Sequence, residues 1–480
     1  MQRTVRFVLD DKIVEIDYSK QPWLKPSITV LNYLRSGPLH KGVKEGCAEG
    51  DCGACTIVVA EPRNNGSLIY KALDSCLVFL PMIHGKQLIT VENLALSGKN
   101  GNILHPVQQM MIETNGTQCG YCTPGIVMSL FALFKNHNGP SREIIEDALT
   151  GNLCRCTGYE PILEAARKAC TDGEDHFSGK EKMILSMLKE ITSGKETLEI
   201  QTEKQTYYKP FTLAEAFRLR KANPEAVLIN GSTDVALRQT KKREFLPVIL
   251  DISAIDELKT FRETNDDYVF GAGLTLEQVK EITEKRIPSI HKILKVFGSL
   301  QIRNIATIGG NIGSASPIGD TLPVLFALGA KIKVGSPASE RILNIEDFIT
   351  GYRQTGLRND ELITEVIVPK IPYGVTIESY KVSKRKDLDI STVTGAFRLK
   401  TQEGIVAEIV LAFGGMAAMT KRALKTENYL EGKKWIRETV QEAMNILDGE
   451  FDPLSDARAG AEFRKTVAAN LLLKFYLETN

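Results

Sequence analysis

The sequence predicts a multidomain α+β protein, and changes in residue pattern along the chain support this prediction. Residues 1–90 contain short runs in which apolar and polar side chains alternate, which is typical of half-buried strands and favours a small β-grasp domain. Residues 91–170 have helical periodicity and short loops, which predict a four-helix bundle. Strands and helices alternate over residues 207–376, which predicts an α/β domain, and residues 377–480 are expected to form a closing α+β domain.

The first domain has a local signal for each expected element. Asp10 and Asp11 separate two alternating runs and favour a hairpin turn between them. The elements expected in this domain are strands over 4–9 and 12–16, a helix over 27–35, a strand over 55–60 and a hairpin turn across 64–66.

Helix start signals locate the elements of the second domain. Ser141 is a good N-cap, and Pro106, Pro124 and Pro161 each suit a first helical turn. The helices expected here cover residues 106–113, 124–134, 144–149 and 162–169.

Residues 171–206 contain short polar and charged stretches and are expected to be a linker with one modest helix around 183–191. The α/β region begins with a capping box, Thr212 with Glu215, and a strand over 226–230. For the closing domain we expect strands over 379–383, 395–400 and 407–413, followed by two amphipathic helices.

Composition and charge exclude several classes of protein. The 480 residues include 60 Lys+Arg and 59 Asp+Glu, a formal net charge of +1, so bulk charge does not hold the chain to nucleic acid or to an anionic membrane. No apolar run reaches the roughly 18 residues needed to span a bilayer. The first ten residues lack the pattern of a secretory signal, and we therefore expect a cytoplasmic protein without a membrane or nucleic-acid partner.

Cysteine is the unusual residue of this chain. There are nine, of which eight lie between Cys47 and Cys156 and the ninth is Cys170. In a reducing cytosol such a cluster is more often metal-binding than disulfide-bonded.

The first cysteine group has the spacing C-x4-C-x2-C followed by a distant cysteine, which is the plant-type [2Fe–2S] spacing. Its members are Cys47, Cys52, Cys55 and Cys76. Glycines permit the positive φ values that a loop wrapped around a cluster needs, and they occur here at Gly46, Gly50 and Gly53. A structural zinc site is the alternative, although zinc prefers paired C-x2-C knuckles and this group contains one such pair.

The second group consists of a C-x2-C and a C-x-C, which fall in two loops between predicted helices. Its members are Cys119, Cys122, Cys154 and Cys156. If the two loops face each other, they supply four thiolates to one metal cluster. A redox-active dithiol at Cys119 and Cys122 is the alternative.

Three motifs around these cysteines closely resemble the two-cluster iron–sulfur segment of the molybdenum hydroxylases, the family of xanthine dehydrogenase and aldehyde oxidase. They are EGCAEGDCGAC at 45–55, TQCGYCTPG at 117–125 and GNLCRCTGY at 151–159. The resemblance implies one [2Fe–2S] cluster on each cysteine group. It also implies that Gln118 hydrogen-bonds to a molybdenum pterin. Of the two clusters, the one on the second cysteine group is implied to lie nearer to that pterin. Cys170 matches no ligand and is expected to be a packed thiol on a helix.

Two loops of the α/β region suit a nucleotide cofactor. A Gly-Ser-Thr turn follows the strand at 226–230, and residues 302–320 form a second loop rich in glycine and serine. No G-x-G-x-x-G with a distant acid is present, so a single Rossmann fingerprint does not explain the two loops.

Both loops resemble the FAD-binding (PCMH-like) domain of the same family. The residues that the resemblance implies at FAD are Leu228, Ile229, Asn230, Gly231, Ser232, Thr233, Asp234, Val235, Phe297, Thr307, Gly309, Gly310, Asn311, Asp320, Ile363 and Lys381. Plain core packing is the alternative for Phe297. The charged stretch 381–389 is either a solvated surface loop or a border of a nicotinamide site.

The resemblance implies an electron-relay role, with no catalytic acid or base on this chain. Within the family, the chain is similar to the small subunit of a split xanthine dehydrogenase. This similarity implies a molybdopterin-binding large subunit as partner, often in a heterotetramer, and electron flow through two [2Fe–2S] clusters and FAD to NAD+. Two alternatives remain, namely the same relay for a partner that oxidises an aldehyde or another N-heterocycle, and a zinc-stabilised binding scaffold without redox activity. NAD+ and O2 both remain open as acceptors.

Overall fold

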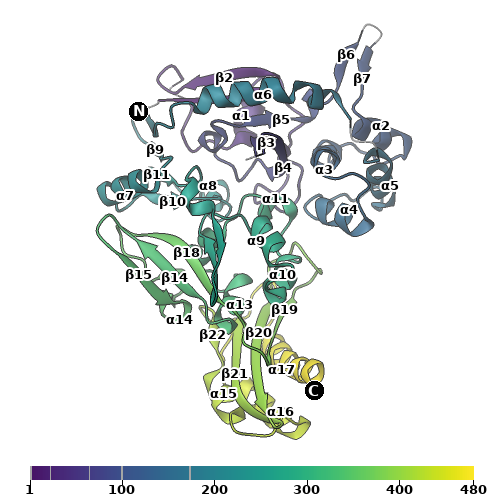
Figure 1. Cartoon of the computed structure of the whole chain (residues 1–480). Helices are drawn as coiled ribbons and strands as arrows, with labels where there is room; N and C mark the ends of the chain where they lie inside the picture. Colours follow the sequence, from purple (N-terminus) through teal and green to yellow (C-terminus); the bar gives the residue numbers. More distant parts are fainter. Residues whose placement is uncertain (1–2, 22, 64, 99–100, 172–173) are drawn as a thin grey trace. The chain divides into compact units, whose positions relative to one another are not determined.

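The computed structural model describes residues 3–21, 23–63, 65–98, 101–171 and 174–480 (Figure 1). The chain forms two compact units. The first comprises residues 1–219, 225–254 and 299–306, and the second comprises residues 220–224, 255–298 and 307–480. None of the helices in the described ranges is long and apolar enough to cross a membrane.

A mixed five-stranded sheet of order β2-β1-β5-β3-β4 forms the amino-terminal part of the first unit. Strands β1 and β5 pair parallel and the other pairs are antiparallel. The hairpin turn at Asp10 and Asp11 is confirmed, since both residues have positive φ between β1 and β2. The predicted turn at 64–66 joins β3 to β4, although Asn64 lies outside the described residues. The elements are β1 (Thr4–Leu9), β2 (Lys12–Asp17), α1 (Val30–Ser36), β3 (Thr56–Pro62), β4 (Leu68–Asp74), η1 (Leu80–Ile83), β5 (Gln87–Ile89), η2 (Val91–Asn93), β6 (Leu96–Gly98) and β7 (Gly101–Ile103).

Four helices follow as expected, and the residues of α3 from Gly125 to Phe134 are all buried. Ser141 caps α4 as predicted, since its Oγ accepts a hydrogen bond from the N–H of Ile144 at 3.4 Å. The helices are α2 (Pro106–Glu113), α3 (Thr123–Asn136), α4 (Arg142–Leu149) and α5 (Glu160–Ala169).

The expected linker at 171–206 is more ordered than its polar composition indicated. Helix α6 (His176–Thr192) begins well before the predicted helix and packs Phe177, Ile184 and Leu188 into the apolar core. The acidic stretch that suggested a linker contains the N-cap Asp175, whose carboxylate accepts from the N–H of Ser178 at 3.0 Å. The polar residues at the start of α6 therefore gave this segment the composition of a linker.

A second sheet of order β10-β11-β9-β8 completes the first unit. It includes residues of the expected linker, because β8 pairs antiparallel with β9. The elements are β8 (Leu198–Gln201), β9 (Thr206–Lys209), α7 (Leu213–Ala222), β10 (Val227–Ile229), α8 (Val235–Thr240), β11 (Val248–Asp251) and α11 (Leu300–Arg303).

The second unit contains an antiparallel sheet of order β12-β13-β18-β14-β15. Its elements are η3 (Asp256–Lys259), β12 (Phe261–Glu263), β13 (Asp267–Gly271), α9 (Leu276–Thr283), α10 (Pro288–Leu294), α12 (Ile308–Ser314), α13 (Thr321–Ala327), β14 (Lys331–Gly335), β15 (Glu340–Asn344), α14 (Ile345–Phe348), β16 (Ile349–Gly351), β17 (Gln354–Thr355) and β18 (Leu362–Pro369).

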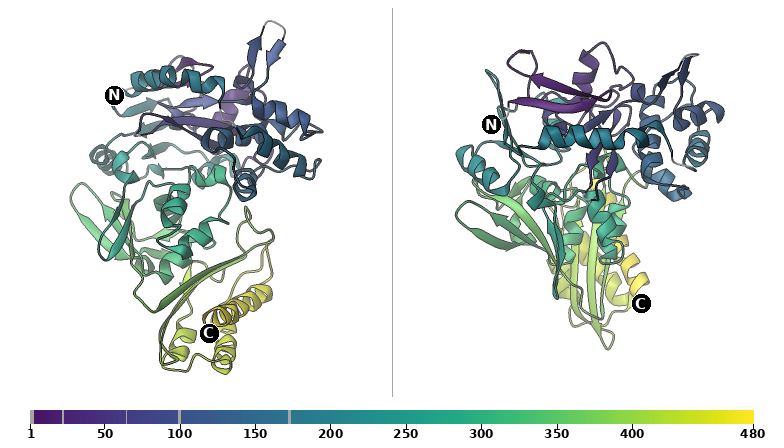
Figure 2. Two further views of the ribbon diagram at one scale, coloured as in Figure 1. Left: turned by 45° about the vertical axis from the view of Figure 1, so that its right-hand side comes forward. Right: turned by 45° about the horizontal axis from the view of Figure 1, so that its top comes forward.

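An antiparallel sheet of order β19-β20-β21-β22 forms the rest of the second unit, and Figure 2 shows its long central strands. The three predicted strands are present. The two predicted helices are present as α16 and α17. A further helix, α15, precedes them and is too short to show helical periodicity in the sequence. The elements are β19 (Val375–Val382), β20 (Val393–Gln402), β21 (Ile405–Gly414), β22 (Lys421–Arg422), α15 (Leu424–Leu430), α16 (Arg437–Asp448) and α17 (Ala461–Thr479).

Candidate functional site: two cysteine groups and two loops

The loop between α1 and β3 carries the first three cysteines and turns its backbone toward a sulfur atom. The N–H groups of Glu49 and Asp51 donate to Cys47 Sγ at 3.4 and 3.3 Å. Gly50 and Gly53 have positive φ, as expected of glycines in this loop, whereas Gly46 does not and the non-glycine Ala48 does. The loop therefore has the geometry of a thiolate-binding turn, in which N–H donors stabilise negative charge on sulfur.

The four sulfurs of the first group form two pairs. A hydrogen bond from Cys52 lowers the pKa of the Cys47 thiol to about 5, and a hydrogen bond between Cys55 and Cys76 raises the pKa of Cys55. Four thiolates shared between two irons is the ligand set of a [2Fe–2S] cluster, whereas a structural zinc ion needs four donors around one point. The paired donor set therefore fits the binuclear cluster.

Two glycines of this loop leave no room for a side chain. A Cβ at Gly46 would lie 2.7 Å from Cys52 Sγ. A Cβ at Gly53 would lie 2.4 Å from both the Nδ2 atom of Asn152 and the carbonyl oxygen of Gly151. Close approach of the chain to the sulfur and to the second cysteine segment therefore requires glycine at both positions.

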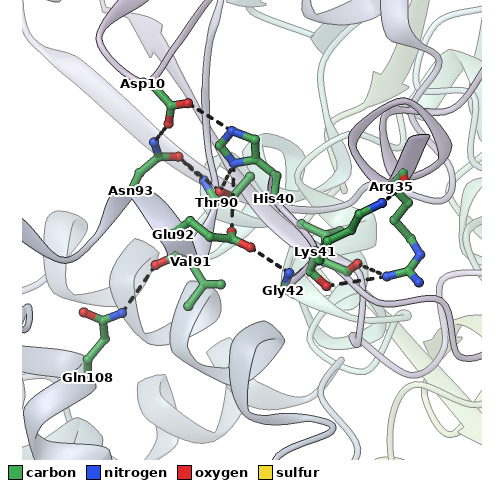
Figure 3. Close-up of polar contacts among 11 residues, drawn as sticks. Asp10, Arg35, His40, Lys41, Gly42, Thr90, Val91, Glu92, Asn93 and Gln108 are labelled. Carbon is green, nitrogen blue, oxygen red and sulfur yellow. Dashed lines mark hydrogen bonds and ion pairs between the residues drawn. The ribbon is translucent and has the colours of Figure 1, made fainter. Parts of the chain in front are cut away.

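A buried histidine anchors the start of the same loop (Figure 3). His40 places Nδ1 2.8 Å from Thr90 Oγ1 and Nε2 3.0 Å from Asp10 Oδ2. Glu92, which follows Thr90, accepts from the N–H of Gly42 at 2.7 Å. These bonds fasten the residues that precede Cys47 to the β1–β2 turn and to the end of β5.

Replacing His40 by alanine is expected to lower the free energy of unfolding by about 1–3 kcal/mol, since Thr90 and Asp10 lose a buried partner. His40 also has φ of +59°, where a Cβ is disfavoured. His40→Gly should therefore be about 1 kcal/mol more stable than His40→Ala. Urea unfolding of both variants measures the difference, and equal stabilities would show that the backbone at this position is not strained.

The second cysteine group is brought together from the α2–α3 and α4–α5 loops. Cys119 interacts with Cys156, and Cys122 interacts with Cys154, so these four sulfurs also form two pairs. Burial raises the pKa of Cys154, but hydrogen bonds from the Thr157 hydroxyl and nearby N–H groups lower it to about 7 overall. The structure therefore unites four thiols that lie far apart in sequence and that suit a second [2Fe–2S] cluster.

Part of this second group reaches the surface. Cys119 and Cys156 are exposed, and so is Gln118, whereas Cys154 is buried. Tyr121 is exposed nearby, and its hydroxyl donates to the carbonyl oxygen of Glu45. The expected pterin contact Gln118 thus lies at the protein surface beside a ligand candidate.

A backbone hydrogen bond that sequence reasoning missed connects the two cysteine groups. The N–H of Leu153 donates to the carbonyl oxygen of Cys52 at 3.1 Å. Leu153 directly precedes Cys154, so the bond joins the backbones of the two loops that carry the cysteine groups. No spacing in the sequence signals this contact, because it joins loops about a hundred residues apart.

Cys170 belongs to neither group. It is buried at the end of α5 within the apolar core, and burial raises the pKa of its thiol to about 12. Its position agrees with the expected packed thiol.

The first predicted flavin loop, residues 228–235, crosses from β10 to α8 in the first unit. Ser232 has φ of +57° and donates its hydroxyl to the carbonyl oxygen of Leu77. A Cβ at Gly231 would lie 2.0 Å from the carbonyl oxygen of Ile305. The turn is therefore held tightly by its own unit, and the Ser232 hydroxyl is already used.

The second predicted loop lies in the second unit at the start of α12. Thr307 caps this helix, since its Oγ1 accepts from the N–H of Gly310 at 3.1 Å. Gly309 packs so closely that a Cβ would lie 2.6 Å from that of Ala272. Phe297 is half-buried after α10, and Ile363 is buried in β18. Thr307, Gly309 and Gly310 form a compact turn with small side chains, as expected for a loop that approaches a nucleotide.

Two of the predicted flavin residues bind each other. Lys381 Nζ lies 2.8 Å from Asp320 Oδ2 and also donates to the carbonyl oxygen of Val296 at 2.9 Å. Asp320 further accepts from the hydroxyls of Ser391 and Thr394. Their nucleotide contacts therefore remain a prediction, and the structure gives the two charges a role in holding β19 and β20 to the start of α13.

Comparison with known protein families agrees with these observations. The [2Fe–2S] binding domain matches residues 90–167, the FAD binding domain in molybdopterin dehydrogenase matches residues 199–371, and the CO dehydrogenase flavoprotein C-terminal domain matches residues 378–479. The chain therefore contains domains of the kind found in molybdopterin dehydrogenases. Their descriptions name FAD and [2Fe–2S] as the bound cofactors, as predicted.

The similar proteins include both xanthine dehydrogenases and a CO dehydrogenase. Xanthine dehydrogenase/oxidase of Gallus gallus is 34% identical over 98% of this chain and 40% of its own length. Xanthine dehydrogenase of Drosophila subobscura is 32% identical over 94% of this chain and 38% of its own length. The chain thus spans about two fifths of the length of these curated relatives.

Among solved structures, CO dehydrogenase from Hydrogenophaga pseudoflava is similar with a TM-score of 0.54 and 25% identity. The similarity covers 56% of this chain and 94% of that one. It agrees with a mixed α+β multidomain fold.

Proposed function

We propose that this chain is the iron–sulfur and flavin electron-transfer subunit of a xanthine dehydrogenase. In this role it takes electrons from a molybdenum site on a partner subunit and delivers them to NAD+. The observation that carries the proposal is the arrangement of eight cysteines as two groups of paired sulfurs, joined by the bond from Leu153 to Cys52.

Each cysteine group would hold one [2Fe–2S] cluster. The β-grasp domain, residues 1–90, would hold the first on Cys47, Cys52, Cys55 and Cys76. The helical bundle, residues 91–170, would hold the second on Cys119, Cys122, Cys154 and Cys156. In both loops the chain supplies N–H donors to sulfur, as at Cys47 and Cys119, which stabilises the thiolate form that binds iron.

FAD would be held by the residues that match the family's flavin loops. The small side chains and backbone N–H groups at Gly231, Gly309 and Gly310 allow the chain to come close to phosphate groups. When bound, the clusters supply one-electron transfer. The flavin supplies both one-electron and two-electron (hydride) chemistry, so it can link the one-electron clusters to NAD+, which accepts a hydride.

The partner would be a molybdopterin-binding large subunit, in a heterotetramer. The exposure of the second cysteine group supports a partner that docks there, since Gln118, Cys119 and Cys156 lie at the surface. An exposed second cluster is suitably placed to receive electrons from another chain.

Replacing Cys119 by serine is expected to abolish purine-dependent NAD+ reduction in the assembled complex, because the second cluster loses a ligand. Oxidation of NADH by an artificial dye should survive, since it needs only the flavin. Steady-state assays of both reactions, with iron and FAD contents measured on the same samples, provide the test.

Cys170→Ala is the matched control, because Cys170 is buried on α5 and belongs to neither group. It should retain both reactions. Loss of both reactions in a folded Cys119→Ser protein that still contains FAD would contradict the proposed relay. A colourless protein loaded with zinc would instead support a binding scaffold.

A further inference from the structure

A fully buried polar network lies between the two cysteine groups. Asn152 Oδ1 accepts from Ser129 Oγ at 2.6 Å and from Gln301 Nε2 at 2.9 Å. Asn152 Nδ2 donates to the carbonyl oxygen of Gly53 and to Thr56 Oγ1, both at 3.2 Å. Every hydrogen-bonding site of this amide is therefore used, which fixes its position and orientation.

The two ends of the Asn152 side-chain amide act on different loops. Gly53 lies between Cys52 and Cys55 in the first loop, and Asn152 itself lies two residues before Cys154 in the second. The Nδ2 bond to Gly53 runs beside the backbone bond from Leu153 to Cys52. A change in the Asn152 amide therefore changes the separation of the two loops.

Gln301 orients this amide from a distant part of the chain. It is completely buried, and its Nε2 donates to Ser129 Oγ at 3.0 Å as well as to Asn152. A Cβ at Gly151 would lie 2.3 Å from Gln301 Oε1, so Gln301 also packs directly on the second loop. Nothing in the spacing of the cysteines indicates a contribution from residue 301.

The segment that carries Gln301 is itself fastened to the first unit. Arg303 is buried and donates twice to Asp147 of α4, at 2.6 and 2.8 Å. Asn304 Nδ2 donates to the carbonyl oxygen of Ala72 in β4 at 3.0 Å. Gln301 therefore acts from a rigid support.

We propose that Asn152 and Gln301 are positioning residues that set the separation of the two [2Fe–2S] clusters, and with it the rate of electron exchange between them. The inference rests on the proposed function, because it needs a cluster on each cysteine group. Neither residue is a ligand. Each acts through the loops that carry the ligands.

The test uses the full chain with both clusters and FAD, reduced stepwise with dithionite. Electron paramagnetic resonance records each reduced cluster and the magnetic interaction between them, which depends on their separation. Asn152→Ala and Gln301→Met should bind both clusters yet weaken or remove this interaction. Stopped-flow reduction should show slower electron exchange between the clusters in both variants than in wild type, because electron transfer slows as its two centres move apart.

Gln109→Ala is the matched control, since it removes an exposed side-chain amide of the helical bundle, whose Nε2 donates to Glu113 Oε1 at 2.9 Å, without touching Asn152 or Gln301, and it should keep the wild-type interaction. If Asn152→Ala does not fold, Ser129→Ala removes one bond to the same amide and should show the same change to a smaller degree. An unchanged interaction in Asn152→Ala and Gln301→Met, or in Ser129→Ala if that variant replaces them, would overturn the inference. Absence of [2Fe–2S] signals from the wild-type chain would instead overturn the proposed function.

Discussion

Replacing Lys209 by methionine is expected to destabilise the first unit by about 3–5 kcal/mol, the usual cost of leaving one charge of a buried ion pair without its partner. Lys209 Nζ lies 2.8 Å from Asp251 Oδ2, and the two side chains are 2% and 0% exposed. The hydroxyl of Tyr207 donates to the same carboxylate at 2.7 Å. Removal of the ammonium leaves this carboxylate buried with neutral donors only. Urea unfolding followed by circular dichroism measures the loss.

Lys292→Met is the matched control, because its ion pair with Glu378 is solvent-exposed and exposed pairs contribute at most about 1 kcal/mol. The double variant Lys209→Met, Asp251→Leu removes both buried charges and should recover part of the loss. A Lys209→Met protein as stable as the Lys292→Met protein would show that the buried pair contributes little.

The effect of Lys209→Met is also expected to depend on pH. Burial alone raises the pKa of Asp251, but the Lys209 ammonium and hydrogen bonds from Lys209 and Ser253 lower it below the ordinary value of 3.8. A carboxyl with a lowered pKa in the folded state contributes stability above its ordinary pKa and loses it as the pH falls toward the folded value. In the variant, burial without the ammonium raises the folded pKa of Asp251 above 3.8. The difference between wild type and variant should therefore be full only above that raised pKa and should shrink as the pH falls through 3.8 toward the lowered wild-type value. A difference that is constant across this range would contradict the assigned role of Asp251.

The cofactor residues that sequence could predict are those that obey a short-range chemical rule. The spacing of Cys47, Cys52 and Cys55 reflects how one loop surrounds two irons, and Gly53 has the positive φ expected of it. The hairpin at Asp10 and Asp11 and the N-cap Ser141 likewise depend on neighbouring residues. Such features depend on neighbouring residues, and the positive φ of Gly53, the hairpin at Asp10 and Asp11 and the N-cap Ser141 were confirmed. The cysteine ligands stay a prediction.

The contacts that sequence could not predict join distant residues. Lys381 and Asp320 were each predicted to meet FAD, but the structure pairs them with each other across 61 residues. Gln301 meets Asn152 across 149 residues, and both are ordinary polar residues whose sequence neighbours give no sign of burial. Helix α6 was partly missed because its capping residue Asp175 belongs to an acidic stretch. In the first two cases a polar side chain is buried by a partner that only the fold supplies.

Replacing Gly231 by alanine is expected to abolish FAD binding, because the added methyl group would meet main-chain atoms. The Cβ would lie 2.0 Å from the carbonyl oxygen of Ile305 and 2.8 Å from the Cα of Ala306. These atoms cannot move aside as a side-chain end could, since Arg303 and Asn304 fasten their segment to α4 and β4. The turn after β10 must therefore shift away, and the loop predicted to face the nucleotide shifts with it.

Flavin absorbance of the purified variant, with FAD released by heat and measured separately, gives the occupancy. Gly179→Ala is the matched control, because a Cβ there meets nothing within 4 Å and alanine favours the helix α6. Iron content distinguishes a local effect from unfolding, since the cysteine groups belong to the same unit. Loss of FAD with full iron content would show that the turn itself binds the flavin. Full FAD occupancy in Gly231→Ala would mean that residues 228–235 are not part of the flavin site.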